Sequence, residues 1–307
     1  MSVRIVAACR SPFSPVGGAL AGWHPVDLAA AVLRGLLERG PVGQPGTEGQ
    51  PIDEVWLGCA EPVGAQGADM ARAAVLAAGW DQRIGGTVIE RAETSGSAAV
   101  HAAVAAIAAG QVTNAVVLGV SLASTVPPGA GALGRIYGRP WGDGPAERAA
   151  AGGGLLPGPV AADRAALHLG IDRDAQEQWT ARSCGLRPAS SRAVLPVEAR
   201  PGEGVAMQRG TLVTTDAGRP EPATPSSMAP AFEPGGTTTG YTFAPPVDGA
   251  AAALAPGGAG GPGRAGRRGH GSGRPATRST RSVVWRRQPA GHWRPPASAC
   301  STCAAGS

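Results

Sequence analysis

The chain has 307 residues, of which 43% are hydrophobic, so it is long enough for about two domains and a sizeable core. No apolar run approaches the ~20 residues that cross a bilayer, and the start of the chain lacks the layout of a signal peptide. We therefore expect a cytoplasmic protein with no membrane partner. The five cysteines are scattered and odd in number, which argues against a disulfide framework.

The charge is divided unevenly along the chain. All 27 basic residues are arginines, and residues 1–256 carry 18 of them against 22 acidic residues, a net charge of −4. Residues 257–307 carry the other 9 arginines and no acidic residue. The chain therefore has a mildly acidic body, residues 1–256, and a strongly basic tail, residues 257–307, and the overall net charge of +5 describes neither part.

Strand and helix patterns alternate through the first 121 residues. Apolar residues in 24–40 recur at helical spacing, and Gly40 ends that pattern. We predict strands at 3–9, 54–59, 86–90 and 114–121, and helices at 24–40, 68–79 and 95–109. The alternation predicts an α/β protein whose mainly parallel sheet is covered by helices. The helix at 95–109 is apolar almost all round, so we expect it to be buried on every side.

The pattern becomes less regular after about residue 125. A stretch rich in Gly and Pro is followed by predicted helices at 160–170 and 172–185. GTTTGYTF (236–243) has the composition of a strand and leads to PPVDGAAAALAP (245–256).

The turn RAETSG joins the strand at 86–90 to the helix at 95–109, and it places Glu93 where the chain enters the helix. A helix N-terminus stabilises an anion through its dipole and its free backbone N–H groups. Acidic residues are common at helix starts, so the turn alone favours a structural interpretation of Glu93.

The order of several segments resembles the thiolases, which cleave or form 3-ketoacyl-CoA. The resemblance covers residues 3 to about 256. It rests on the segments RIVAACRSPFSPVGG, VWLGCAEPVGAQGADMARAAVLAAG, RAETSGSAAV, DAGRPEPATPSSMAPAF and GTTTGYTFAPPVDGAAAAL. It implies an α/β, thiolase-like fold that is incomplete, with a first α/β half and an inserted loop domain but no second half.

The resemblance also implies the domain organisation. Residues 1–124, completed by 235–256, would form the first α/β half, and residues 125–234 would form the loop domain that covers the substrate. Residues 257–307 would be a disordered basic tail, which we interpret as the product of a frameshift because Arg, Gly, Pro and Ala are what GC-rich DNA encodes in a wrong frame.

In the family, the position of Glu93 holds the cysteine that accepts the acyl group. A carboxylate cannot form the stable thioester that lets a thiolase divide its reaction into two steps. The family's catalytic histidine motifs and its second catalytic cysteine motif do not occur in this sequence. The resemblance thus implies a thiolase-like acyltransferase that is impaired or inactive in this form, with no cofactor beyond a coenzyme A thioester as substrate.

The resemblance assigns CoA contacts to Arg219, Ser227 and Phe232. A family serine that contacts the pantetheine arm is replaced by Ala244. Cys300 and Cys303 form a lone CSTC pair, so we expect no metal site. The expected partners are acyl-CoA and further copies of the chain, as a homodimer or a thiolase-type oligomer.

Three alternatives remain open from the sequence. Glu93 could support decarboxylation of an acyl-CoA, as a carboxamide at the equivalent position does in related ketosynthases. The chain could be a non-catalytic protein that binds CoA or another thiolase subunit. The arginine-rich tail could bind nucleic acid through phosphates, a partner that we do not favour.

Overall fold

The computed structural model describes residues 3–39, 52–133, 138, 140–185, 192–217 and 224–257. The predicted tail, apart from Gly257, and Arg219 lie outside the described residues. The strands are β1 (Ala7–Arg10), β2 (Ser14–Pro15), β3 (Glu54–Gly58), β4 (Gly85–Ile89), β5 (Asn114–Leu122), β6 (Val197–Glu198), β7 (Leu212–Val213) and β8 (Val247–Pro256). The helices are α1 (Pro25–Arg39), α2 (Met70–Ala77), α3 (Ser95–Ala108), α4 (Ala130–Leu133), α5 (Asp143–Ala149), α6 (Gly158–Leu169) and α7 (Arg173–Gly185), with 3-10 turns at Gly64–Gln66, Ala150–Gly152 and Pro225–Ser227.

A mixed sheet organises the first part of the chain, in the order β1-β8-β5-β3-β4, with β2 also paired to β8. The strands β4, β3 and β5 are parallel, as the strand–helix alternation predicts. The strand β8 runs antiparallel to both β5 and β1. It returns from far along the chain, so a segment outside the alternating region completes the sheet.

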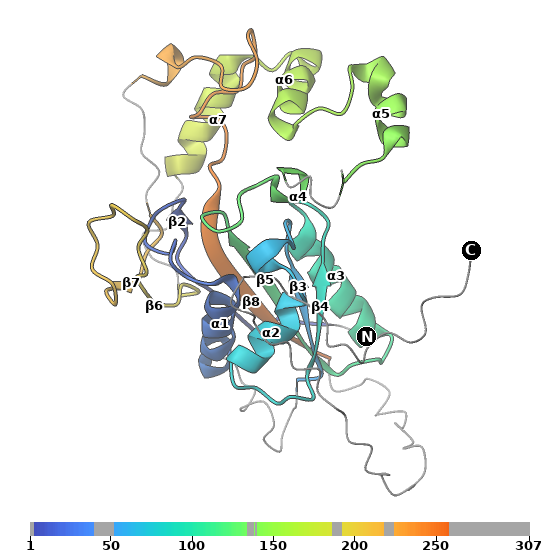
Figure 1. The fold of residues 1–307 in the computed structure, drawn as a ribbon, viewed down its shortest axis with the longest axis vertical. Coiled ribbons are helices and arrows are strands. Elements are labelled where there is room, and N and C mark those ends of the chain that lie inside the picture. The colour runs from blue at the N-terminus through green and yellow to red at the C-terminus, as the bar shows by residue number, and fades with distance from the viewer. Residues whose placement is uncertain are drawn as a thin grey trace, which may run out of the picture. The chain divides into compact units, whose positions relative to one another are not determined.

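The helices α1 and α2 cover one face of this sheet and α3 covers the other, as Figure 1 shows. Successive residues of a strand point to opposite faces, and Val55 and Leu57 accordingly pack under α1 and α2 while Trp56 packs under α3. Both faces of the central strands are therefore buried, which explains their nearly continuous apolar sequence.

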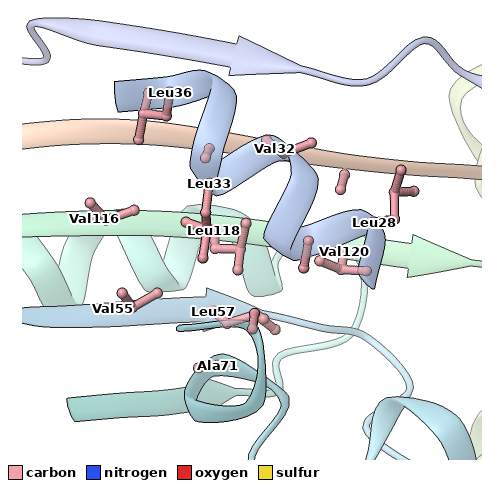
Figure 2. Close-up of a cluster of buried hydrophobic side chains, with 14 of the residues drawn as sticks. Leu28, Val32, Leu33, Leu36, Val55, Leu57, Ala71, Val116, Leu118 and Val120 are labelled. Atoms are coloured by element: carbon pink, nitrogen blue, oxygen red, sulfur yellow. The ribbon is translucent and has the colours of Figure 1, made fainter. Parts of the chain in front are cut away.

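The larger core lies beneath α1. Figure 2 shows side chains of α1 packed against those of the central strands, and the residues that it labels are Leu28, Val32, Leu33, Leu36, Val55, Leu57, Ala71, Val116, Leu118 and Val120. Leu33 has no exposed surface. Burying one such side chain contributes about 1.5–3 kcal/mol, so the helical spacing of these residues is what fixes α1 on the sheet.

The prediction that the helix at 95–109 is buried on every side is wrong for the described chain. In α3 the buried side chains are Ser95, Ala99, Ala103, Ala106 and Ile107, which form one stripe against the sheet. His101 and Val104 lie on the exposed side. The all-apolar sequence did not indicate which side faces the sheet.

GTTTGYTF is also not a strand. Among the described residues, this stretch makes an isolated bridge, Pro230 with Thr239, and a turn that begins at Thr239. No described helix is long and apolar enough to cross a membrane.

Leu33→Ala should lower the free energy of unfolding by about 3 kcal/mol, because it leaves a cavity between α1 and the sheet. Urea denaturation followed by circular dichroism measures this change. Leu76→Ala is the matched control, since Leu76 on α2 is 48% exposed, and it should change the value by less than about 1 kcal/mol. Equal losses in both variants would contradict this packing.

Candidate functional site

The turn between β4 and α3 carries Glu93 directly after a left-handed residue, Ala92. Ala92 has a φ of 46°, a conformation that few residues other than glycine adopt. The Ala92 N–H donates to the Glu90 side chain at 2.8 Å. Such strain persists only where the surrounding structure fixes it, and it is typical of functional turns.

The hydroxyl group of Ser95 holds this turn together. It accepts from the Arg91 N–H at 2.8 Å and donates to the Ala92 carbonyl at 2.6 Å. Ser95 is 3% exposed, so both hydrogen bonds are partly shielded from water. The first residue of α3 thereby closes the turn that leads into the helix.

A glycine at the end of β3 lets the helix approach the sheet closely. A Cβ atom on Gly58 would lie 2.5 Å from both the Gly96 nitrogen and the Ser95 oxygen. Only a hydrogen at this position leaves room for the first turn of α3. The position of the turn relative to the sheet therefore depends on Gly58.

Glu93 is exposed, and its side chain makes no hydrogen bond or ion pair to any described residue. It lies two residues before α3, beside the open N–H groups of the first helical turn. Those groups stabilise negative charge. The turn thus presents a carboxylate, to solvent, at the place where the resemblance expects a thiol.

The two buried cysteines, Cys9 and Cys59, do not replace that thiol at the turn. Cys59, which follows Gly58, is 1% exposed, and burial raises the pKa of its thiol. Burial also raises the pKa of Cys9, to about 11. A raised pKa leaves little thiolate at neutral pH, and the thiolate is the nucleophile. No group of three or more described His, Cys, Asp or Glu residues could hold a metal ion.

Two of the three predicted CoA-contacting residues lie in the described segment 224–243, which we call the CoA segment. Ser227 ends a 3-10 turn, and its exposed hydroxyl donates to the Thr224 carbonyl at 2.9 Å. Phe232 is 41% exposed, and its ring packs edge-on against Phe243 with the centroids 5.0 Å apart. Within the described residues, no hydrogen bond or ion pair joins Glu93 to this segment.

The helices α6 and α7 hold the CoA segment through side chains that sequence reasoning missed. Arg173 donates to the carbonyls of Pro225 at 3.0 Å and Met228 at 2.6 Å. Asp163 accepts four hydrogen bonds from Thr237 and Thr238. A signal for Asp163 was present in the sequence, because this acid lies three residues from Ala166 on the buried side of its helix.

The stretch that leads to Arg219 is tied to the sheet. Asp216 accepts two hydrogen bonds from the Arg10 guanidinium, at 2.6 and 2.8 Å, and one from the Phe13 N–H at 2.9 Å. Such paired charge-assisted bonds fix geometry more strictly than a single contact does. They fix the chain three residues before Arg219.

Together, a mixed sheet, helices on both faces and a strained strand-to-helix turn define an α/β protein. Residues 3–256 match the family model described as "Thiolase, N-terminal domain". The chain therefore belongs to the thiolase family, and the expected thiolase-like α/β fold is confirmed for the part that matches.

Named relatives agree with this assignment. A 3-ketoacyl-CoA thiolase of Vibrio cholerae is 32% identical over 261 residues, which cover 82% of this chain and 64% of the relative. A beta-ketoadipyl-CoA thiolase of Pseudomonas aeruginosa is 36% identical over 137 residues, 45% of this chain and 33% of the relative. The chain thus spans between a third and two thirds of the length of these relatives.

A solved structure shows the same fold. The acetyl-CoA acetyltransferase of Syntrophomonas wolfei superposes with a TM-score of 0.66 at 23% identity, over 83% of this chain and 65% of that chain. The fold therefore corresponds to part of the thiolase fold, as the sequence predicts.

Gly58→Ala should destabilise the protein by about 1–3 kcal/mol, because the new methyl group would overpack the contact between β3 and α3. Gly119→Ala is the matched control. Gly119 lies beside Gly58 in the register of the sheet, and in the described part of the chain no atom beyond its chain neighbours lies within 4 Å of where its Cβ would be. Thermal denaturation of both variants tests this, and a Gly58→Ala variant as stable as the control would contradict the close contact.

Glu93→Cys should introduce a thiol with a pKa below the ordinary value of about 8.5, because the N-terminus of α3 stabilises its thiolate. The measurement is the pH dependence of alkylation by iodoacetamide, followed at the modified peptide by mass spectrometry. Ala105→Cys provides an exposed thiol on the same helix, far from its N-terminus. If the two thiols titrate together, the turn does not stabilise an anion.

Proposed function

We propose that this chain is a thiolase-family protein that binds acyl-CoA but is catalytically impaired as an acyltransferase. The observation that carries the proposal is Glu93, which stands in the strained turn before α3 where a thiolase would present its acyl-accepting cysteine. The left-handed Ala92 and the two hydrogen bonds of Ser95 support this interpretation of the turn.

A carboxylate and a thiol at residue 93 would form acyl products of different stability. Attack by a carboxylate on a thioester would give a mixed anhydride, which is less stable than the thioester it replaces. A cysteine instead gives a second thioester of about the same energy, so the acyl group can be transferred and held. Cys59 does not substitute, because it is buried and the pKa of its thiol is raised.

Binding of acyl-CoA does not require the nucleophile. The CoA segment presents the exposed Ser227 hydroxyl and the exposed ring of Phe232, and α6 and α7 hold its backbone. Polar and aromatic groups presented from a fixed backbone suit a ligand with both a polar nucleotide and an apolar arm. The names of the relatives, which include 3-ketoacyl-CoA and beta-ketoadipyl-CoA thiolases, favour a CoA thioester as that ligand.

The exposed side of α3 favours association of the chain in solution. Val104 is 37% exposed, and the neighbouring Ala105 and Ala108 are exposed as well. An apolar helix surface of this kind gains free energy when a partner covers it. A homodimer or a thiolase-type oligomer is therefore part of the proposal.

Purified protein should show no thiolysis of acetoacetyl-CoA and no covalent acetylation by acetyl-CoA. Thiolysis is measured from the loss of acetoacetyl-CoA absorbance, and acetylation by intact-protein mass spectrometry. An active thiolase serves as the positive control in both assays. Robust turnover, or an acetyl group on Glu93, Cys59 or Cys184, would contradict the proposal.

A further inference from the structure

Asp163 is a buried acid that accepts four hydrogen bonds, and the proposed chemistry does not use it. It projects from α6, and it is 5% exposed. Its Oδ1 atom accepts from the N–H of Thr237 at 3.0 Å, the N–H of Thr238 at 2.7 Å and the hydroxyls of the same two residues at 3.2 and 2.6 Å. Four donors on one buried oxygen fix both threonines.

The charge of Asp163 is retained despite its burial. Burial alone raises the pKa of its carboxyl group, but the hydrogen bonds from Thr238 and Thr237 outweigh burial and lower it. The carboxylate therefore forms charge-assisted bonds, which are roughly twice as strong as bonds between neutral groups. Gly236 allows this approach, because a Cβ there would lie against Oδ2 and 3.0 Å from Cγ of Asp163.

The two fixed threonines belong to the CoA segment, and they determine where its residues 230–232 lie. The Ala231 N–H donates to the Thr238 carbonyl at 2.9 Å, and Pro230 and Thr239 form a bridge. Phe232 follows Ala231 directly, and its ring packs on Phe243. A connected series of contacts therefore runs from Asp163 through Thr238 to the backbone of Phe232.

Gln176 on α7 also holds Thr237, because its amide donates to the Thr237 hydroxyl at 2.8 Å. Arg173 holds the beginning of the segment near Ser227. The segment is thus fixed at two places, and Asp163 supplies most of the hydrogen bonds at the second.

We propose that Asp163 is a positioning residue for CoA binding, which holds residues 230–232 of the CoA segment and thereby the ring of Phe232. The inference rests on the proposed function, since it assigns the ligand of this segment as coenzyme A. Asp163 itself touches no ligand in this role, and it acts through Thr237 and Thr238.

The test compares Asp163→Ala and Asp163→Asn in the full chain, with coenzyme A titrated by isothermal calorimetry. Asp163→Ala removes the acceptor and should weaken binding about tenfold. Asp163→Asn keeps an acceptor oxygen at the Oδ1 position and should restore binding to within about threefold of the unmodified protein. Rescue by the amide distinguishes positioning from a general loss of packing.

Asp53→Asn is the matched control. Asp53 accepts from the N–H groups of Thr113 and Asn114 at 2.7 and 2.9 Å, at an edge of the sheet that the CoA segment does not contact through any described hydrogen bond. This variant should lower stability and leave the affinity for coenzyme A unchanged. An equal loss of affinity in Asp53→Asn and Asp163→Ala would overturn the inference.

Hydrogen exchange provides a second measurement that does not depend on the ligand. In Asp163→Ala the amides of Thr237 and Thr238 should exchange faster while those of β5 and β8 remain protected. If Asp163→Ala does not fold, Thr238→Val is measured in its place, because it removes the hydroxyl that donates to Asp163 at 2.6 Å. Unchanged amide exchange at residues 237 and 238 in the variant that is measured overturns the inference.

The two proposals fail differently. If the unmodified protein does not bind coenzyme A, the proposed function is overturned, and the assignment of the CoA segment fails with it. If the unmodified protein binds coenzyme A and Asp163→Ala binds it equally well, only the role of Asp163 is overturned.

Discussion

The contact between Gly58 and the first turn of α3 is the constraint on which the site depends. Side chains normally separate a helix from the sheet that it covers, but here the helix backbone meets the strand where a Cβ on Gly58 would collide with Ser95 and Gly96. The close approach forces the chain to turn sharply after β4, and Ala92 takes up that turn at a φ of 46°. The partly buried hydrogen bonds of Ser95 then offset the strain. Backbone packing therefore fixes where residue 93 is presented.

This arrangement explains how the fold tolerates a charged, exposed side chain at residue 93. The side chain of Glu93 is exposed and forms no bond to the described residues, so the turn does not depend on it. A surface substitution of this kind changes stability by a few tenths of a kcal/mol. Under the proposed function, its effect on acyl transfer would be far larger, because that reaction needs a thioester-forming atom at residue 93. The structure and the chemistry of the turn are thus separable.

Sequence reasoning succeeded where burial alone determines structure. The helical spacing of Leu28, Val32 and Leu36 predicted α1, and the apolar strands predicted the parallel part of the sheet, because each pattern reports one buried face. It failed for GTTTGYTF, whose threonines suggested a strand. Their hydroxyls and N–H groups bond instead to Asp163, 74 and 75 residues away, and no local pattern reports such a partner. The strand–helix pattern located the turn and Glu93. The side chains that hold the CoA segment lie far from it in the sequence, so no pattern indicated them.

The CoA segment also differs from the core in what holds it. Its backbone is rich in Gly, Pro and Thr, and its aromatic rings Phe232 and Phe243 remain more than a third exposed. Burial of Tyr241, which is 5% exposed, contributes to its order. The hydrogen bonds that Asp163 accepts and that Arg173 and Gln176 donate offset further conformational entropy that is lost. A segment stabilised in this way can open locally without unfolding the sheet. Its anchors consequently affect ligand affinity more than global stability, whereas residues under α1 have the opposite effect.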